Sequence, residues 1–410
     1  MEDKQLLIEE GYKHSTALLR ENATEYGMLA ASPKSEEGKR KEYTSLFSRD
    51  IGVSCLGMFA SGDEELISIG ERSLENLAKA QSKLGQFPFF SEPGKQQIQW
   101  WMPGSLDSTI WWCIAVLKNL ELTGKRDFYE KYKENLEKAF TWLQYQDTNN
   151  DGLVEQGECS DWADEMPRMG AVLYSNALWY WLVRLRVEVE GRTDLEPMRQ
   201  RVYEAANTML WVHKRNDSAL NYVPDNNYVR DNFFAANIIE WTNTRAVFLP
   251  YYLGFVSHKS FEMRCDVYGN ILACISGLAD AEKAKEITDF VVRSGINLPY
   301  PVKVLYPPIY PGEQDWRDYM SKGRQNYPWQ YHNAGIWPYV GGFWVYWLAE
   351  HNPTLAKEEL YRLALANKVG DWEFNEYLHG QHGTAMGISF QSWNMGMYIA
   401  AYTAVQKTAA

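Results

Sequence analysis

The chain has 410 residues, and 53 acidic side chains against 41 Lys and Arg give it a net charge of -12. An acidic chain without a basic run repels a phosphate backbone, so the composition argues against nucleic acid as a partner. Its 45% hydrophobic and 23% charged residues are typical of a globular protein with a large core. The 17 Trp residues exceed what a core requires, and this surplus calls for a functional explanation.

The chain carries no targeting or membrane signal that we recognise. Residues 1–20 are charged from the second position and lack the apolar stretch of a secretory signal. The richest apolar run, residues 171–185, is interrupted by polar side chains, so no membrane span is predicted. The five cysteines are scattered without a CxxC pair, which favours reduced thiols over disulfides or a zinc site. We therefore expect a cytoplasmic location.

Helical periodicity recurs along nearly the whole chain, and strand-like alternation is weak. Helices are predicted at residues 4–20, 64–82, 107–121, 127–146, 172–190, 194–213, 233–249, 259–278, 279–293, 335–349, 354–367 and 390–405. Residues 296–310 are rich in Pro and are expected to form a long loop. Because no flexible linker or block of like charge divides the chain, we expect a single all-α domain over residues 1–410.

The predicted connections alternate between short turns and long loops. Short turns occur at residues 61–63 and 350–353. The long loops are rich in aromatic residues, Gly and Pro, and they span residues 85–106, 149–170, 216–232, 297–333 and 370–389. A ring of helical hairpins has this pattern, with its long loops at one mouth, so the sequence predicts an (α/α)6 toroid. A helical solenoid would show a repeat of about 34 to 47 residues, and none is visible.

The segment 46–50 and four of the long loops, at residues 85–106, 149–170, 297–333 and 370–389, set carboxylates, amides or Arg among aromatic side chains. A sugar requires this mixture, because its C–H faces pack on aromatic rings while its hydroxyls bind polar groups. Cleavage of a glycosidic bond also needs two carboxyl groups. One has a raised pKa and protonates the leaving oxygen, and the other activates water or attacks directly. A neighbouring Trp or Phe desolvates a carboxyl and raises its pKa.

Five segments carry a more specific resemblance. They are Phe47-Ser-Arg-Asp, Leu106-Asp-Ser-Thr-Ile-Trp-Trp, Asp161-Trp-Ala-Asp, His332-Asn-Ala-Gly-Ile-Trp-Pro, and Phe374-Asn-Glu-Tyr followed by Phe390-Gln-Ser-Trp. In this order they resemble motifs of the inverting (α/α)6-barrel, or six-hairpin, glycosidases. That superfamily includes trehalases, processing α-glucosidases, mannosylglycerate hydrolases, neutral invertases and the amylo-α-1,6-glucosidase part of debranching enzymes. The resemblance implies inverting hydrolysis of a terminal α-linked glucosyl or similar residue of a small carbohydrate, without a cofactor.

The resemblance also implies roles for individual residues. In the family pattern the Asp after the Trp is the general acid and the Glu before the Tyr is the general base, which points to Asp164 and Glu376. Asp161 also flanks Trp162 and stays open as the acid. The predicted sugar contacts are Arg49, Asp50, Trp101, Asp107, Trp111, Asp161, Trp162, Arg168, Gln330, His332, Asn333, Trp337, Gln381 and Trp393.

Three alternatives concern single features. Glu158 and Glu165 are further candidates for the acid, and Glu373 competes with Glu376 for the base. Residues 147–152 with Glu158 fit the calcium-loop pattern D-x-N-x-D-G-x5-E. A structural Ca²⁺ at Asp147, Asn149 and Asp151 is therefore the alternative to a simple turn.

Two other functions share the predicted fold. An enzyme similar to N-acylglucosamine epimerases would use two histidines, for which His332 and His382 are the candidates. A non-catalytic sugar-binding protein is the other interpretation. The carboxyl groups placed after a Trp and before a Tyr favour hydrolysis over the epimerase, and sugar binding without either activity would indicate the binding protein.

Overall fold

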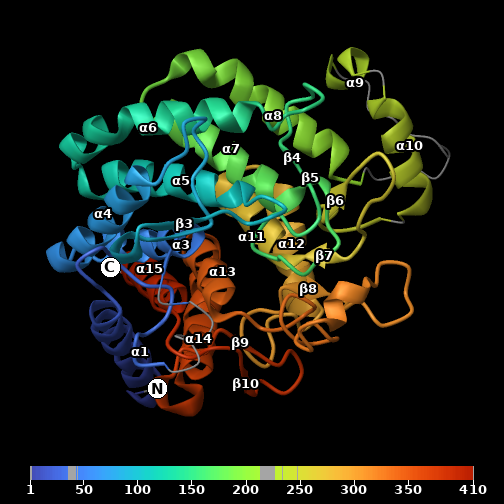
Figure 1. The fold of residues 1–410 in the computed structure, drawn as a ribbon. Coiled ribbons are helices and arrows are strands. Elements are labelled where there is room, and N and C mark those ends of the chain that lie inside the picture. The colour runs from blue at the N-terminus through green and yellow to red at the C-terminus, as the bar shows by residue number, and fades with distance from the viewer. Residues whose placement is uncertain are drawn as a thin grey trace.

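The computed structural model describes residues 2–35, 43, 45–212, 227–232, 234–246 and 248–409. Within them, helices form two rings around one axis (Figure 1). The inner ring consists of α3 (Ser48–Ala60), α5 (Leu106–Thr123), α7 (Leu173–Glu188), α11 (Val267–Ser276), α13 (Pro338–His351) and α15 (Ser392–Ala409). Each inner helix packs against the next, and α15 packs against α3 and closes the ring. This arrangement is the all-α (α/α)6 toroid that the alternating connections predict.

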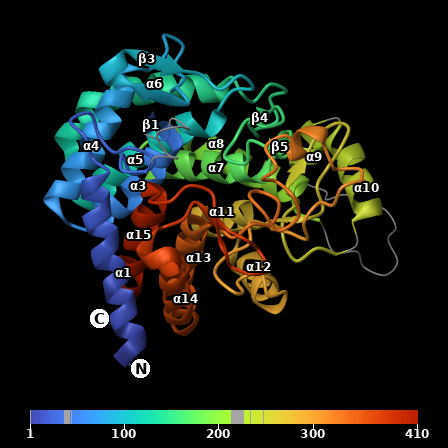
Figure 2. The ribbon, with the colours of Figure 1, turned by 60° about the horizontal axis from the view of Figure 1, so that its bottom comes forward.

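The outer helices alternate with the inner ones along the chain. They are α1 (Glu2–Glu21), α4 (Glu64–Lys79), α6 (Arg126–Gln144), α8 (Glu196–Met209), α12 (Ala281–Arg293) and α14 (Pro353–Trp372). Figures 1 and 2 show α1 beside α15, so the first and last helices lie together. Two further helices, α9 (Asn227–Asp231) and α10 (Ala235–Arg245), lie at the periphery in both views.

Short antiparallel strands brace the connections. Three-stranded sheets join β1 (Leu46–Phe47), β2 (Phe90–Glu92) and β3 (Gln97–Gln99), and also β4 (Glu155–Gln156), β5 (Gly170–Val172) and β6 (Phe255–Val256). Two-stranded sheets pair β7 (Cys265–Asp266) with β8 (Leu305–Tyr306), and β9 (Tyr377–Leu378) with β10 (Ala385–Met386). Short 3-10 helices occur at Pro93–Lys95, Thr193–Leu195 and Asp318–Ser321. Because β1, β5 and β7 run directly into α3, α7 and α11, these sheets fix where three inner helices begin.

All six inner helices begin at the same end of the toroid, because residues of their first turns contact one another. The strands and long loops therefore gather at this end, which we call the mouth. None of the helices in the described ranges has both the length and the apolar composition to cross a bilayer.

The observed helices differ from the predicted ones in three places. No helix is predicted at residues 48–60, where the structure has α3, and the first turn of α3 lies in the segment 46–50. Every residue of α3 except Ala60 is buried, so this helix has no polar face and no amphipathic period to detect. The helix predicted from residue 259 begins only at Val267, after β7. The helix predicted at 233–249 corresponds to α10, outside the two rings. Residue 233, residue 213 and most of the predicted loop 216–232 lie outside the described residues.

Two glycines allow α3 and α15 to pack backbone against backbone. A Cβ atom at Gly57 would lie 1.8 Å from the carbonyl oxygen of Gly396, and one at Gly396 would lie 2.5 Å from the Cα of Ser54. Both distances are far below van der Waals contact. The closure of the inner ring at α3 and α15 therefore requires the absence of a side chain at these positions.

We expect Gly57→Ala to lower the free energy of unfolding by about 1–3 kcal/mol, because the added methyl group overpacks the contact with α15. The better helix propensity of Ala, about 1 kcal/mol, does not offset this strain. Urea denaturation measures the change. Ser68→Ala on the exposed side of α4 is the control and should alter stability by less than about 0.5 kcal/mol. A Gly57→Ala protein as stable as the parent would contradict the close approach.

Candidate active site

The second residue of each inner helix lies in a layer of contacting side chains across the mouth. These residues are Arg49, Asp107, Tyr174, Tyr268, Tyr339 and Trp393. One half of the layer is polar and the other half is aromatic. Local motifs predict three of the six as sugar contacts, namely Arg49, Asp107 and Trp393. The fold accounts for all six, because each is the second residue of an inner helix.

The polar half is built around the carboxylate of Asp107. Arg49 donates to it through Nε at 2.6 Å and Nη2 at 3.1 Å, and the Tyr174 hydroxyl donates at 2.9 Å. Trp111 in turn donates its Nε1–H to the Tyr174 oxygen at 2.9 Å. The Arg49 and Asp107 side chains are 7% and 0% exposed. This bidentate ion pair is buried, and it fixes the position of the first turn of α3 relative to the first turn of α5.

We expect Arg49→Met to cost about 3–5 kcal/mol of stability, because it leaves the Asp107 carboxylate buried without its cation. The double variant Arg49→Met/Asp107→Leu removes both charges and should recover part of this loss. Chemical denaturation of both proteins gives the comparison. If Arg49→Met is as stable as the parent, the pair does not hold the mouth together.

The aromatic half continues from Tyr174. The ring of Tyr268 lies 5.1 Å from that of Tyr174 and 5.4 Å from that of Tyr339. Tyr339 stacks on Trp393 at 4.3 Å with an interplanar angle of 13°. The Nε1–H of Trp393 is buried and has no hydrogen-bond partner among the described residues. A buried donor of this kind favours a ligand that offers an oxygen acceptor.

Asp161 and Asp164, the two candidate acids, have different surroundings. The Asp161 carboxylate is 1% exposed and accepts hydrogen bonds from the Ala163 backbone at 2.8 Å and from Gln156 Nε2 at 2.8 Å. It also accepts from Arg168 Nη2 at 2.7 Å and Nε at 3.1 Å. With donors on both oxygens, Asp161 acts as an acceptor that fixes Arg168.

Asp164 has the properties of a proton donor. Its side chain is 21% exposed, so a ligand can reach it, yet its surroundings raise its pKa to about 7. Burial is the main cause; Arg49 opposes the rise, and the carboxylates of Glu165 and Glu376 add to it. The Nδ1 atom of His332 lies 3.9 Å from Asp164 Oδ1. A carboxyl group that keeps its proton near neutral pH suits general acid catalysis.

Glu376 is held in a fixed orientation. It is 3% exposed, and its Oε1 accepts from the Tyr43 hydroxyl at 2.9 Å. Its Oε2 accepts from the Ile388 backbone N–H at 3.1 Å. Gly387 lies directly against it, since a Cβ atom there would be 2.5 Å from Oε2 and the residue has a φ of +73°. Glycine at 387 thus leaves room for the carboxylate.

Tyr43 is a site residue that the sequence analysis missed. It stands seven positions before Asp50 in a segment without periodicity or a motif, so its place depends on how the chain enters the mouth. Its hydroxyl has a pKa raised well above the ordinary value, first by burial and then by the negative charges of Glu376, Asp164 and Asp50. The pKa of Tyr331 is raised by burial and by Asp164 and Glu376 as well. The carboxyl groups therefore converge on these two tyrosines.

Asp50 is a third carboxyl group with a shifted pKa. Burial raises its pKa to about 7, although the neighbouring Arg49 acts in the opposite direction. The charges of Glu376 and Asp107 contribute to the rise. The charge of Glu376 thus raises the pKa of both Asp50 and Asp164, and carboxyl groups coupled in this way are characteristic of a site that handles protons.

Aromatic rings line the loop that carries Asp161 and Asp164, which we call the acid loop. Trp162 meets Trp337 edge to face at 5.4 Å and meets His332 at 4.9 Å. His332 stacks on Trp337 at 5.1 Å and 12°. Burial, with Arg168 and Arg49, lowers the pKa of His332 well below its ordinary value, so this ring is neutral. The Nε1–H of Trp162 has no partner within the described residues.

Two predicted contact residues lie behind the walls. Trp111 is fully buried, and its rings pack on Trp181 and Phe343 below the layer at the mouth. Asn333 is also fully buried, and its side chain exchanges two hydrogen bonds of 2.7 and 2.8 Å with the backbone of Ile309. Both residues position the site from a distance.

Three others lie on the loops. Trp101 donates its Nε1–H to the Cys159 carbonyl at 2.7 Å, which ties the loop after β3 to the acid loop. Gln330 is half-buried at the start of the His332 segment. Gln381 is exposed beside His379, to which its backbone N–H donates at 3.2 Å. A sugar contact from these positions stays a prediction.

The calcium-like loop is closed by its own backbone. Asp147 accepts from the N–H groups of Asp151 and Gly152, each at 2.9 Å. Glu158, which the pattern requires as the last ligand, accepts instead from the Tyr319 hydroxyl at 2.9 Å. Across the described ranges, no group of three or more His, Cys, Asp or Glu is placed to hold a metal ion.

Comparison with known proteins places this geometry in context. A family model described as "Alkaline and neutral invertase" matches residues 198–408. "Cytosolic invertase 1" of Oryza sativa subsp. japonica is 24% identical, with 92% of this chain and 74% of that protein covered. "Probable alkaline/neutral invertase D" of Arabidopsis thaliana is 26% identical, and the match covers 72% of this chain and 59% of the relative's length.

Solved structures share the fold. The GH63 mannosylglycerate hydrolase of Thermus thermophilus superposes with a TM-score of 0.65 at 12% identity, over 95% of this chain and 99% of that one. A bacterial glucoamylase crystallised with acarbose also gives 0.65 at 12% identity, over 97% of this chain and 55% of that one.

Proposed function

Because this chain belongs to the alkaline and neutral invertase family, we propose that it is a glycoside hydrolase that removes a terminal α-linked glucosyl or similar residue from a small carbohydrate. The observation that carries the proposal is the pairing of Asp164 with Glu376. Asp164 is a carboxyl group that a ligand can reach, and its pKa is raised to about 7. Glu376 is a carboxylate in a fixed orientation. The charges of both raise the pKa of Tyr43 and of Tyr331. The family makes sucrose the first substrate to test.

In the proposed mechanism, Asp164 protonates the glycosidic oxygen while Glu376 takes a proton from the water that attacks the anomeric carbon. The hydrogen bonds from Tyr43 and Ile388 support the second role, since they aim the Glu376 carboxylate. Positive charge develops on the sugar in the transition state. The neutral aromatic walls and the nearby carboxyl groups suit such a charge. We propose a single displacement with inversion.

The test is the release of free sugar from a panel of glycosides. Sucrose, trehalose, isomaltose, limit dextrin, glucosylglycerate and mannosylglycerate are incubated with the protein, and the products are separated and identified. We expect glucose and fructose from sucrose. No release from any member would overturn the proposal, and interconversion of free hexoses would favour the epimerase instead.

The arrangement of the histidines supports hydrolysis over the epimerase. His332 is buried, neutral and stacked on Trp337. His382 is exposed and stacks on His379 at 4.8 Å. The groups with the chemistry of an acid and a base are the carboxyls.

Location and extent belong to the same proposal. We propose that the protein works in the cytoplasm as one catalytic domain over residues 1–410. The rice relative is named cytosolic, whereas "Alkaline/neutral invertase C" of Arabidopsis thaliana is named mitochondrial. Fractionation of cells followed by detection of the protein distinguishes the compartments.

A further inference from the structure

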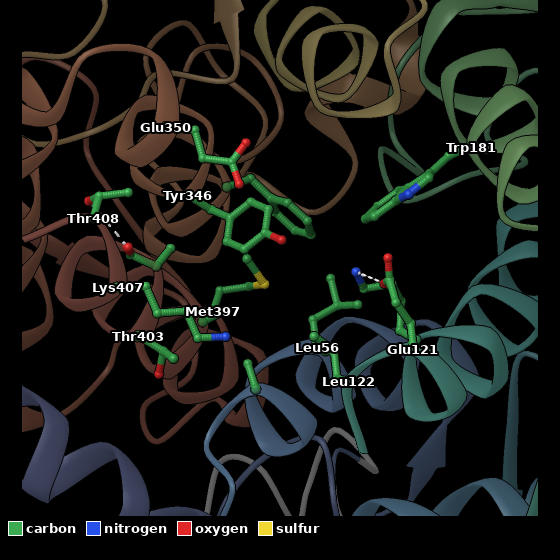
Figure 3. A pocket seen from close by; sticks show the side chains of 15 residues that line it. Leu56, Glu121, Leu122, Trp181, Tyr346, Glu350, Met397, Thr403, Lys407 and Thr408 are labelled. Carbon is green, nitrogen blue, oxygen red and sulfur yellow. Dashed lines mark hydrogen bonds and ion pairs between the residues drawn. The ribbon is translucent and has the colours of Figure 1, made fainter. Parts of the chain in front are cut away.

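A cavity lies toward the end of the toroid opposite the mouth. It has a volume of about 290 Å³, and five of the inner helices line it from their middle to their C-terminal turns (Figure 3). A groove of about 780 Å³ adjoins it and shares the side chains of Trp181, Tyr346 and Glu350 with it. Since Arg49 and Asp107 begin α3 and α5, whereas Leu56 and Leu122 line this cavity, the body of the inner ring separates it from the mouth.

The walls of this far cavity are apolar and aromatic. Trp181 and Tyr346 stand on opposite sides, and Leu56 and Met397 lie below them in this view (Figure 3). Phe343 forms part of the lining as well. Aromatic rings that border an open space can pack on the apolar face of a flat molecule.

The rim carries both signs of charge in equal number. Lys118 and Glu121 of α5 form an ion pair, and Lys118 is only 8% exposed. Glu350 of α13 and Lys407 of α15 complete the rim. An organic cation or anion would meet a like charge on either side, which costs free energy in a partly buried site. A neutral ligand with donors and acceptors around its edge can bind both the ammonium and the carboxylate groups.

Aromatic faces with a rim of donors and acceptors are complementary to a sugar ring, and 290 Å³ is close to the lower end of small-ligand sites, about 300–1,000 Å³. We propose that the far cavity binds one ring of a neutral sugar, as a site separate from the mouth. The adjoining groove gives room for a second sugar unit. This proposal does not depend on which glycoside is cleaved.

Methyl NMR tests the proposal without an activity measurement. In protein labelled with [¹³C-methyl]-Met, D-glucose should shift the Met397 signal in a saturable way. The signal of Met198, which lies on the outer helix α8 and outside the lining of the cavity, is the internal control and should stay in place. Met397→Leu assigns the signal. Because the readout is the Met397 methyl, a failure here is distinct from a failure of hydrolysis.

Two variants separate the site from indirect effects. Ala404→Trp fills the cavity and should abolish the shift, whereas Gln406→Trp adds the same bulk on α15 outside the lining and should preserve it. The double variant Glu350→Gln/Lys407→Met alters two exposed rim residues and should weaken binding of glucose about tenfold. It covers the case in which Ala404→Trp does not fold.

Three results would overturn the proposal. One is an unmoved Met397 signal at glucose concentrations up to about 100-fold above those that saturate the mouth. Another is a shift that persists unchanged in both the filled and the rim variants. The third is a Met397 shift with benzamidinium but not with glucose, which would make the cavity a cation site.

Discussion

Asp164→Asn is expected to lower kcat on sucrose by about 10²- to 10⁴-fold, the usual contribution of a general acid. The amide cannot give a proton to the glycosidic oxygen, so the leaving sugar would have to depart as an alkoxide. Asn is close to Asp in size, and the side chain is 21% exposed, so the fold should survive the change. Steady-state kinetics measures the loss, and circular dichroism checks the fold.

A substrate that needs no acid separates this role from a binding role. Fluoride leaves without protonation, so α-glucosyl fluoride should be hydrolysed by Asp164→Asn at a rate within about tenfold of the parent. Asp161→Asn is the comparison, because it breaks the Arg168 contacts and should impair both substrates alike. An equal loss on sucrose and on the fluoride in Asp164→Asn would remove Asp164 from the acid role.

The pH dependence follows from the same carboxyl group. A general acid works in its protonated form, which prevails below its pKa. With the pKa of Asp164 raised to about 7, kcat/KM on sucrose should fall as the pH rises through about 7 and beyond. This alkaline limb should be absent when Asp164→Asn hydrolyses α-glucosyl fluoride. A parent profile that stays level to about pH 9 would contradict the assignment.

Glu376→Gln is the second change with a large expected effect, again a loss of about 10²- to 10⁴-fold in kcat. Gln keeps an oxygen that can accept from Tyr43 or Ile388, but it cannot take a proton from water. The loss should extend to α-glucosyl fluoride, since water must still be activated. This opposite response to the fluoride distinguishes the base from the acid.

Glu373→Gln is the matched control for the base. It is the same chemical change three residues earlier, on the carboxylate that competes for the role in the sequence. We expect near-parental turnover from Glu373→Gln. A collapse in Glu373→Gln together with an active Glu376→Gln would exchange their roles.

Sequence patterns predict the toroid because hairpins of amphipathic outer helices are joined by unequal connections. They do not predict α3, because a helix that is buried on all sides has no periodic pattern of apolar and polar residues. They also miss Tyr43, which reaches Glu376 across 333 positions of sequence. Such a contact depends on how the ring closes and not on any local pattern.

The choice between Asp161 and Asp164 shows the same limit. Both flank Trp162, and the sequence leaves either one open as the acid. Only the folded chain brings Arg168 and Gln156 to Asp161 and leaves Asp164 within reach of a ligand. The hydrogen-bond partners and the exposure of a carboxyl group set its chemistry, and both depend on the tertiary structure.

The tryptophans around the mouth come from both loops and helices. Trp162 and Trp337 from loops join Trp393 from the start of α15 around the mouth. Trp100 from a loop is 43% exposed, and Trp181 from α7 lines the far cavity. Position along the toroid axis, and not the type of element, decides what each indole contacts.

The central claim is a single displacement at the anomeric carbon by water activated at Glu376 while Asp164 protonates the leaving group. Proton NMR of the first glucose released from sucrose tests it most directly, because mutarotation is slow enough to be followed. The account predicts β-glucose as the first product, since one displacement inverts the α-linkage. The appearance of α-glucose first would contradict it, because that product requires two displacements.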